Sequence, residues 1–149
     1  MGRAVAATLE IVSAVLLIGL IGVTVVDVIG RYVFDAPLTG AFEITELLLG
    51  ALVFAALPLV SRAGEHVEVD ILAVLLPARV SAALLWLAAL LAAVVLAYFA
   101  WQLFHLSQQQ RAAGSVSMSL GVPLSPLAVF GAAACLLAAI YGFVRAMRA

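Results

Sequence analysis

The sequence predicts an all-α integral membrane protein, a single domain over residues 1–149 with four transmembrane helices. Its residues are 67% hydrophobic and 10% charged, a composition that excludes a soluble domain. Four apolar runs are long enough to cross a bilayer core of ~30 Å, which takes about 20 helical residues. The alternating pattern of a β-barrel is absent, and helices are the other fold that satisfies backbone hydrogen bonds in lipid.

The four apolar runs define the expected spans, the first and third being longer than the minimum. We place these spans at residues 5–29, 42–60, 80–106 and 122–144. Pro37 and Gly40 indicate a turn in the connection from Gly30 to Ala41. The polar stretch 107–119 is the expected connection between the third and fourth spans.

A short interfacial helix is expected between the second and third spans. Asp70 is a suitable N-cap for the apolar segment 71–76, and Pro77 would end it. Because this segment is too short to cross the membrane, we expect it to lie at the interface.

Arginine sets the predicted orientation, since the chain has no lysine. If both termini are cytoplasmic, five of the seven arginines lie inside and only Arg31 and Arg111 lie outside. This distribution agrees with the positive-inside rule. The first apolar run is longer than the hydrophobic region of a cleavable signal and contains Glu10, so we expect it to remain as the first span.

Nine of the fifteen Arg, Asp and Glu residues lie between Asp27 and Asp70, although charge beside lipid is costly. Asp27 and Arg31 are four apart, so they share a helix face and can form an ion pair at the outer end of the first span. Glu43 and Glu46 share a face at the outer start of the second span. The dipole at a helix N-terminus favours them there without any function, and an ion or partner site is the alternative.

The charged run around His66, from Arg62 to Asp70, lies at the inner end of the second span. A hard metal ion needs oxygen ligands converging from several directions, which a linear run does not supply. We therefore interpret Arg62, His66 and Asp70 as a hydrogen-bonded turn and predict no metal site.

This pattern bears on three function classes. No nucleophile–base pair can be assembled, so we predict no enzyme and no cofactor. A haem or quinone anchor subunit is an alternative, but Arg79 and His105 are about 39 Å apart along one helix, so His66 and His105 cannot ligate one haem. A self-contained small transporter is the other alternative, although no ionisable residue lies deep within a span.

Small residues form ridges that would let another helix approach closely. One ridge in the fourth span consists of Ala134, Ala138 and Gly142, and a similar one in the third span consists of Ala89, Ala93 and Ala97. Packing among the chain's own helices and packing against a partner both remain open for these ridges.

The charged stretch and the residues before the fourth span carry a series of short motifs in a fixed order. These motifs are R31-Y-V-F-x-x-P37, E43-x-x-E46-L, R62-x-G-x-H66-x-x-V69-D70-x-L72, L76-P77 and L120-G-V-P123. Their order and spacing resemble the DctQ-type small membrane subunit of tripartite ATP-independent periplasmic (TRAP) transporters. The resemblance covers nearly the whole chain.

The resemblance implies a scaffold subunit in a bacterial inner membrane. In such systems a periplasmic solute-binding protein delivers an organic acid, commonly a carboxylate, to a large membrane subunit of about a dozen spans, which carries it in a sodium-driven step. By this resemblance Arg31, Glu43 and Glu46 are expected to face the large subunit or the binding protein. Arg62, His66 and Asp70 are expected to brace the inner turn.

Overall fold

The structure is a computed structural model that describes residues 2–63 and 78–147, and all of its regular elements in that part are helices. The helices are α1 (Gly2–Val33), α2 (Ala41–Ala63), α4 (Ala78–Ala113) and α5 (Ser125–Ala146). Each is long and apolar enough to cross a membrane, so the predicted all-α fold with four spans is confirmed. The predicted interfacial helix at 71–76 lies outside the described residues.

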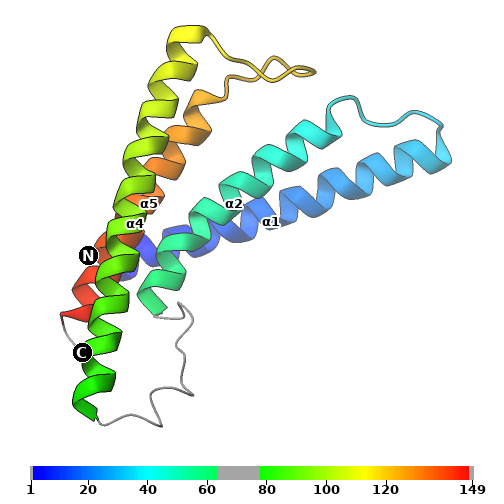
Figure 1. Ribbon diagram of the computed structural model, residues 1–149. Helices are drawn as coiled ribbons and strands as arrows, with labels where there is room; N and C mark the ends of the chain where they lie inside the picture. The colour runs from blue at the N-terminus through cyan, green and yellow to red at the C-terminus, as the bar shows by residue number, and fades with distance from the viewer. Residues whose placement is uncertain (1, 64–77, 148–149) are drawn as a thin grey trace.

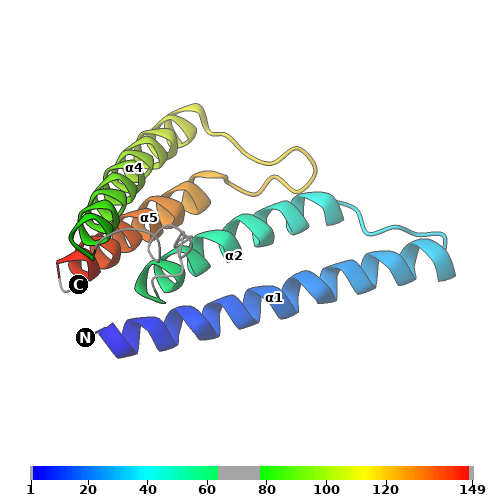
Figure 2. The same cartoon turned by 60° about the horizontal axis from the view of Figure 1, so that its bottom comes forward.

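The four helices lie side by side in a row, in the order α1–α2–α5–α4 (Figure 2). Within the described part of the chain, α1 packs only on α2, and α4 packs only on α5. The α1–α2 pair diverges from the α4–α5 pair toward the end that carries the connections 34–40 and 114–124 (Figure 1). We call that end the outer end. The first residues of α1 and the last of α5 both lie at the opposite, inner end (Figure 1).

Small residues make the close contacts within the row. Ala134 and Ala138 of α5 are 3% and 0% exposed, whereas a Cβ added to Gly142 would meet no atom within 4 Å. At Gly131, a Cβ would lie only 2.7 Å from the Phe54 ring of α2. Membrane helices gain little from hydrophobic burial against one another, so close backbone approach at such positions supplies the packing.

Helix α4 contacts α5 along a stripe that repeats every three or four residues. Its less exposed residues are Ala89, Ala93, Leu96, Ala100, Leu103, Ser107 and Gln110. This stripe includes two members of the predicted alanine ridge, but Ala97 is exposed. Ala97 lies off the α5 contact because a strict spacing of four drifts from a contact face whose average spacing is 3.5, so packing of Ala97 against a partner stays a prediction.

Helices α1, α2 and α4 extend beyond the predicted spans at both ends, whereas α5 is shifted toward the C-terminus. The polar segment 107–113 was expected in a connection, but it forms the last two turns of α4. Gln, Arg and Ala are good helix formers, so the helix continues where its apolar run has ended. Helix α1 likewise continues to Val33, and α5 begins at Ser125, three residues later than the predicted span.

Candidate functional site

The candidate site is the outer rim, which we define as the outer ends of α1 and α2 together with the connections 34–40 and 114–124. Helix α1 ends where the Gly30 carbonyl accepts hydrogen bonds from the backbone N–H groups of Phe34 and Ala36. A Cβ at Gly30 would lie 2.6 Å from the Ala36 carbonyl oxygen, so the chain turns closely over this glycine. Asp35 has a φ of 48°, a left-handed conformation that Asp tolerates better than most residues.

Asp27 joins α1 to the connection that follows it. Its Oδ2 accepts a hydrogen bond from the Arg31 guanidinium at 2.7 Å, and its Oδ1 accepts one from the Leu38 backbone N–H at 3.0 Å. The predicted pairing of Asp27 with Arg31 is confirmed. Because both carboxylate oxygens are engaged, Asp27 holds the start of α2 close to the end of α1.

Two substitutions of Asp27 should loosen the connection 34–40 to different degrees. Asp27→Ala removes both hydrogen bonds, so the backbone amide of Leu38 should exchange with solvent markedly faster. Asp27→Asn keeps a carbonyl oxygen that can accept the Leu38 N–H and loses only the ion pair, so its exchange should rise less. Hydrogen exchange read by mass spectrometry measures both, and equal exchange in the wild type and Asp27→Ala would contradict the assignment.

The connection 114–124 folds back on itself as a small hairpin. Val116 and Pro123 form an antiparallel bridge, the Ser117 N–H donates to the Val122 carbonyl at 2.9 Å, and the Gly121 N–H donates to the Ser117 carbonyl. The hairpin reaches from α4 toward the outer end of α2 (Figure 1). It therefore crosses the side on which the two helix pairs diverge.

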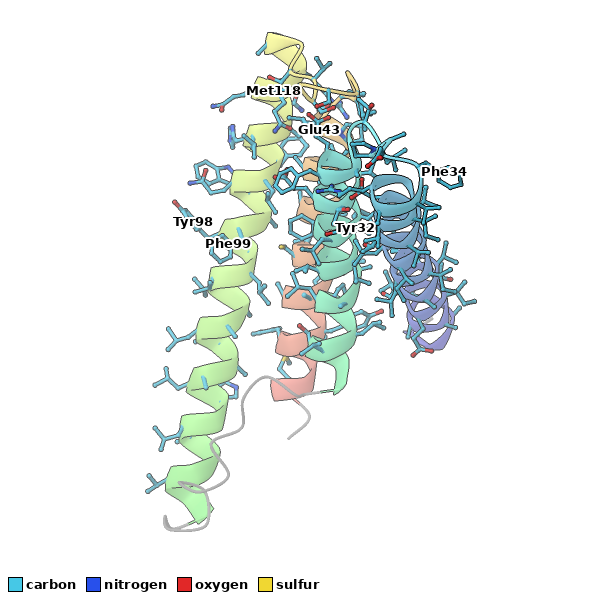
Figure 3. All side chains as sticks on the ribbon, turned by 90° about the vertical axis from the view of Figure 1, so that its right-hand side faces the viewer. Tyr32, Phe34, Glu43, Tyr98, Phe99 and Met118 are labelled. Atoms are coloured by element: carbon cyan, nitrogen blue, oxygen red, sulfur yellow. The ribbon has the colours of Figure 1, made fainter. Side chains whose placement is uncertain are left out.

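Glu43 fastens this hairpin to α2. Its Oε1 accepts a hydrogen bond from the Ser119 backbone N–H at 2.7 Å, and its Oε2 accepts one from the Leu120 N–H at 3.1 Å. Figure 3 shows Glu43 beneath the hairpin that carries Met118. Residues 76 and 77 positions apart are thus joined by one carboxylate. Because the carboxylate is charged, these are stronger bonds than neutral ones.

Gly40 gives the hairpin a second contact with the start of α2. Its φ is +79°, and a Cβ placed on it would lie 2.7 Å from the Leu120 side chain. The Leu120 side chain therefore occupies the space that a side chain at position 40 would need. The left-handed backbone and the close contact both require glycine here.

Gly40→Ala should destabilise the rim more than Gly121→Ala. Gly121 also has a positive φ, +66°, but a Cβ there meets nothing within 4 Å, so its substitution isolates the backbone strain, of order 1 kcal/mol. Gly40→Ala causes the same backbone strain and also displaces the Leu120 side chain. Adding Leu120→Ala to the Gly40→Ala variant should therefore recover only the stability lost through that displacement. Thermal unfolding midpoints measure the differences, and equal losses for the two glycine variants would refute the contact.

The other predicted site residues that the structure describes lie at the end of α1 and at the two ends of α2. Glu46 lies one turn after Glu43, is exposed, and makes no hydrogen bond to another residue of the described part. Arg31 is committed to Asp27, although its side chain remains 57% exposed. Arg62 lies at the inner end of α2, while His66 and Asp70 lie outside the described residues. Among residues 2–63 and 78–147, no three metal-ligating side chains come together.

Sequence reasoning missed the role of the hairpin and its apolar tip. Met118 is fully exposed, and Tyr32, Phe34 and Phe42 are each at least 71% exposed around the same end of the row (Figure 3). The only sequence signal was the alternation of apolar and polar residues over 115–122, which is short and lies in a predicted loop. Such side chains need lipid or protein beside them.

The comparison with known families decides the identity of this arrangement. Residues 20–149 match the family model described as tripartite ATP-independent periplasmic transporters, DctQ component. The chain belongs to the DctQ family. The match covers all of the outer rim and α2, α4 and α5, and it begins within α1. No curated protein matches the chain.

Membership in the DctQ family makes the chain a component of a tripartite transporter, and its four helices make it a multi-pass membrane protein. The outer rim of this DctQ protein adds polar contacts between the two helix pairs to the apolar packing of α2 on α5. The hydrogen bonds of the Glu43 carboxylate to the hairpin backbone have a structural role, because they position the hairpin. The side chains of Glu46, Met118 and the exposed aromatic residues remain accessible to a neighbouring molecule.

Proposed function

We propose that this DctQ chain is the scaffold subunit of a TRAP transporter in a bacterial inner membrane. In this role it supports a large membrane subunit during sodium-driven, binding-protein-dependent uptake of an organic acid, with a carboxylate as the expected class of solute. The chain would not translocate solute itself. The family match supports the first part of this proposal, and the helix arrangement supports the second.

The open row of helices is the observation that carries the scaffold role. Each helix packs on at most two others within the described residues, so no ring of helices encloses a path for solute. A transporter binds its substrate between helices near the midplane, usually beside broken segments. Here the buried residues of the most enclosed helix, α5, are Ala, Gly and Cys apart from Ser125 in its first turn, so they offer no charged group to hold an ionic solute.

The proposed topology places the outer rim in the periplasm and both termini in the cytoplasm. The arginine distribution supports it, and the N-terminal end of α1 and the C-terminal end of α5 lie at the same end of the row (Figure 1). Glu46, Arg31 and the exposed rim side chains would then face the large subunit or the binding protein. The segment with Arg62, His66 and Asp70 would lie on the cytoplasmic side, together with the expected interfacial helix.

Co-purification tests the scaffold role. An affinity-tagged chain expressed in its native organism should co-purify with a much larger polytopic membrane protein in a fixed subunit ratio. A tagged, unrelated four-span protein serves as the control for non-specific capture. Recovery of the chain by itself, stable and monodisperse, would contradict the proposal. A visible Soret band in the purified material would instead favour the haem-anchor alternative.

A further inference from the structure

The free face of α4 is the stripe that points away from the rest of the row. Its residues recur every three or four positions, and all of them are exposed. These residues are Leu84, Leu87, Leu91, Val94, Tyr98, Trp101, Gln102, His105, Gln108 and Gln109. The stripe lies opposite the one that packs on α5, about 200° around the helix from Ala100 to Tyr98 at 100° per residue. Figure 3 shows Tyr98 and Phe99 pointing away from the other helices.

The chemistry of this free face changes in one direction along the helix. It is aliphatic from Leu84 to Val94, aromatic at Tyr98 and Trp101, and carries amides at Gln108 and Gln109. Aliphatic residues suit the hydrocarbon core, and Trp and Tyr suit the interface where headgroups begin. From Val80, also exposed, to Trp101 the helix rises about 32 Å, which matches a hydrocarbon core of ~30 Å.

Two side-chain pairs on the face interact within the helix itself. The Gln102 Nε2 donates a hydrogen bond to the Tyr98 hydroxyl at 2.6 Å, and the rings of Trp101 and His105 make an edge-to-face contact at 4.7 Å between centroids. Each pair is four residues apart, the spacing at which side chains on a helix meet. The Gln102–Tyr98 hydrogen bond lowers the cost of placing these two polar groups beside lipid without a second protein chain.

Side-chain size differs on average between this face and the α5-facing stripe of α4. That stripe includes the small residues Ala89, Ala93, Ala100 and Ser107 beside larger ones, as expected where helices approach closely. The listed residues of the free face from Leu84 to His105 are all valine or larger, and the exposed alanines of α4 lie toward the margins of this face, at Ala83, Ala88 and Ala97.

We propose that the free face of α4 is covered by phospholipid in the assembled transporter, with its aromatic belt at the headgroup level of the outer leaflet. Helix α4 is then the lipid-facing edge of the row, and the large subunit contacts the chain elsewhere. This inference rests on the proposed assembly but concerns a different surface property. It assigns the belt of Tyr98, Trp101 and His105 as an anchor that fixes the depth of the row in the membrane.

Site-directed spin labelling tests this assignment. The native Cys135 is first replaced by Ala, and single cysteines are introduced by Leu91→Cys, Val94→Cys, His105→Cys and Gln109→Cys. Leu103→Cys, on the α5-facing stripe, is the matched control. Each labelled chain is reconstituted in phosphatidylethanolamine–phosphatidylglycerol vesicles, alone and with its membrane partner. Power saturation then reports access to oxygen, which concentrates in lipid, and to a water-soluble nickel chelate.

The expected result is high oxygen access at Leu91 and Val94 that does not fall on assembly, and increasing access of the nickel chelate from His105 to Gln109. The Leu103 label should be protected from both reagents throughout. Loss of oxygen access at Leu91 and Val94 on assembly would show a protein cover and overturn the proposal. Nickel access already at Val94 would overturn the assigned depth. Assembly is measured separately by co-purification, and failure to assemble would count against the proposed function. In that case the reagent access measured for the chain alone still tests the proposed depth of the aromatic belt.

Discussion

Gly131→Ala will push α2 and α5 apart and destabilise the chain, with an expected loss of about 1–3 kcal/mol, the usual cost of overpacking. The new Cβ would lie 2.7 Å from the Phe54 ring, closer than packed carbon atoms allow. Both helices would have to shift, because α2 and α5 form the central contact of the row. The thermal unfolding midpoint of the detergent-solubilised chain measures the loss.

The matched control for Gly131→Ala is Gly22→Ala. Gly22 lies within α1, and a Cβ there meets nothing within 4 Å, so this substitution gains helix propensity of up to about 1 kcal/mol without a clash. A second control is the pair Gly131→Ala with Phe54→Ala, which removes the ring that the new methyl group would strike. The double variant should lose less than the sum of the single losses. Additive losses, or a neutral Gly131→Ala, would show that the contact does not hold the helices.

Glu43→Gln will release the hairpin from α2. A glutamine offers one acceptor oxygen and an NH₂ group that cannot accept the second backbone N–H, and it removes the charge that strengthens both bonds. The amides of Ser119 and Leu120, which donate to Glu43, should therefore exchange much faster in hydrogen-exchange mass spectrometry. The rest of α4 and α5 should keep its protection, because those helices pack on each other independently of the hairpin.

Glu46→Gln is the matched control for Glu43→Gln. The two residues are three apart on the same helix and undergo the same change of charge, but Glu46 is exposed and makes no hydrogen bond to a described residue. Its substitution should leave exchange of the hairpin unchanged. Equal acceleration by both variants would point to a general effect of charge at the start of α2, rather than to the two hydrogen bonds of Glu43.

The features that local rules govern were predictable from the sequence. Four apolar runs of sufficient length gave four helices, because a backbone in lipid satisfies its hydrogen bonds within the helix. The pairing of Asp27 with Arg31 followed from a spacing of four residues within one helix. The end of α4 was predicted seven residues too early, because Gln108, Gln109 and Arg111 continue the helix as good helix formers even though they are polar.

Features that join distant parts of the chain were not predictable from one sequence. Nothing local to Glu43 indicates that its partners are backbone N–H groups 76 and 77 residues away. The order α1–α2–α5–α4 could not be predicted either. Small residues occur on most of the helices, and their positions do not identify which helix packs against them. Gly131 illustrates this: its lack of a side chain has meaning only once Phe54 is seen against it.

Transport measured with one component omitted at a time tests the central claim that this DctQ chain is a scaffold and not a conduit. Vesicles are prepared with the chain alone, with the large membrane subunit alone, and with both, each with the periplasmic binding protein, a sodium gradient and labelled organic acid. We predict uptake only when both membrane subunits are present and none by the chain alone. Sodium-dependent uptake by vesicles that contain this chain without the large subunit would contradict the account.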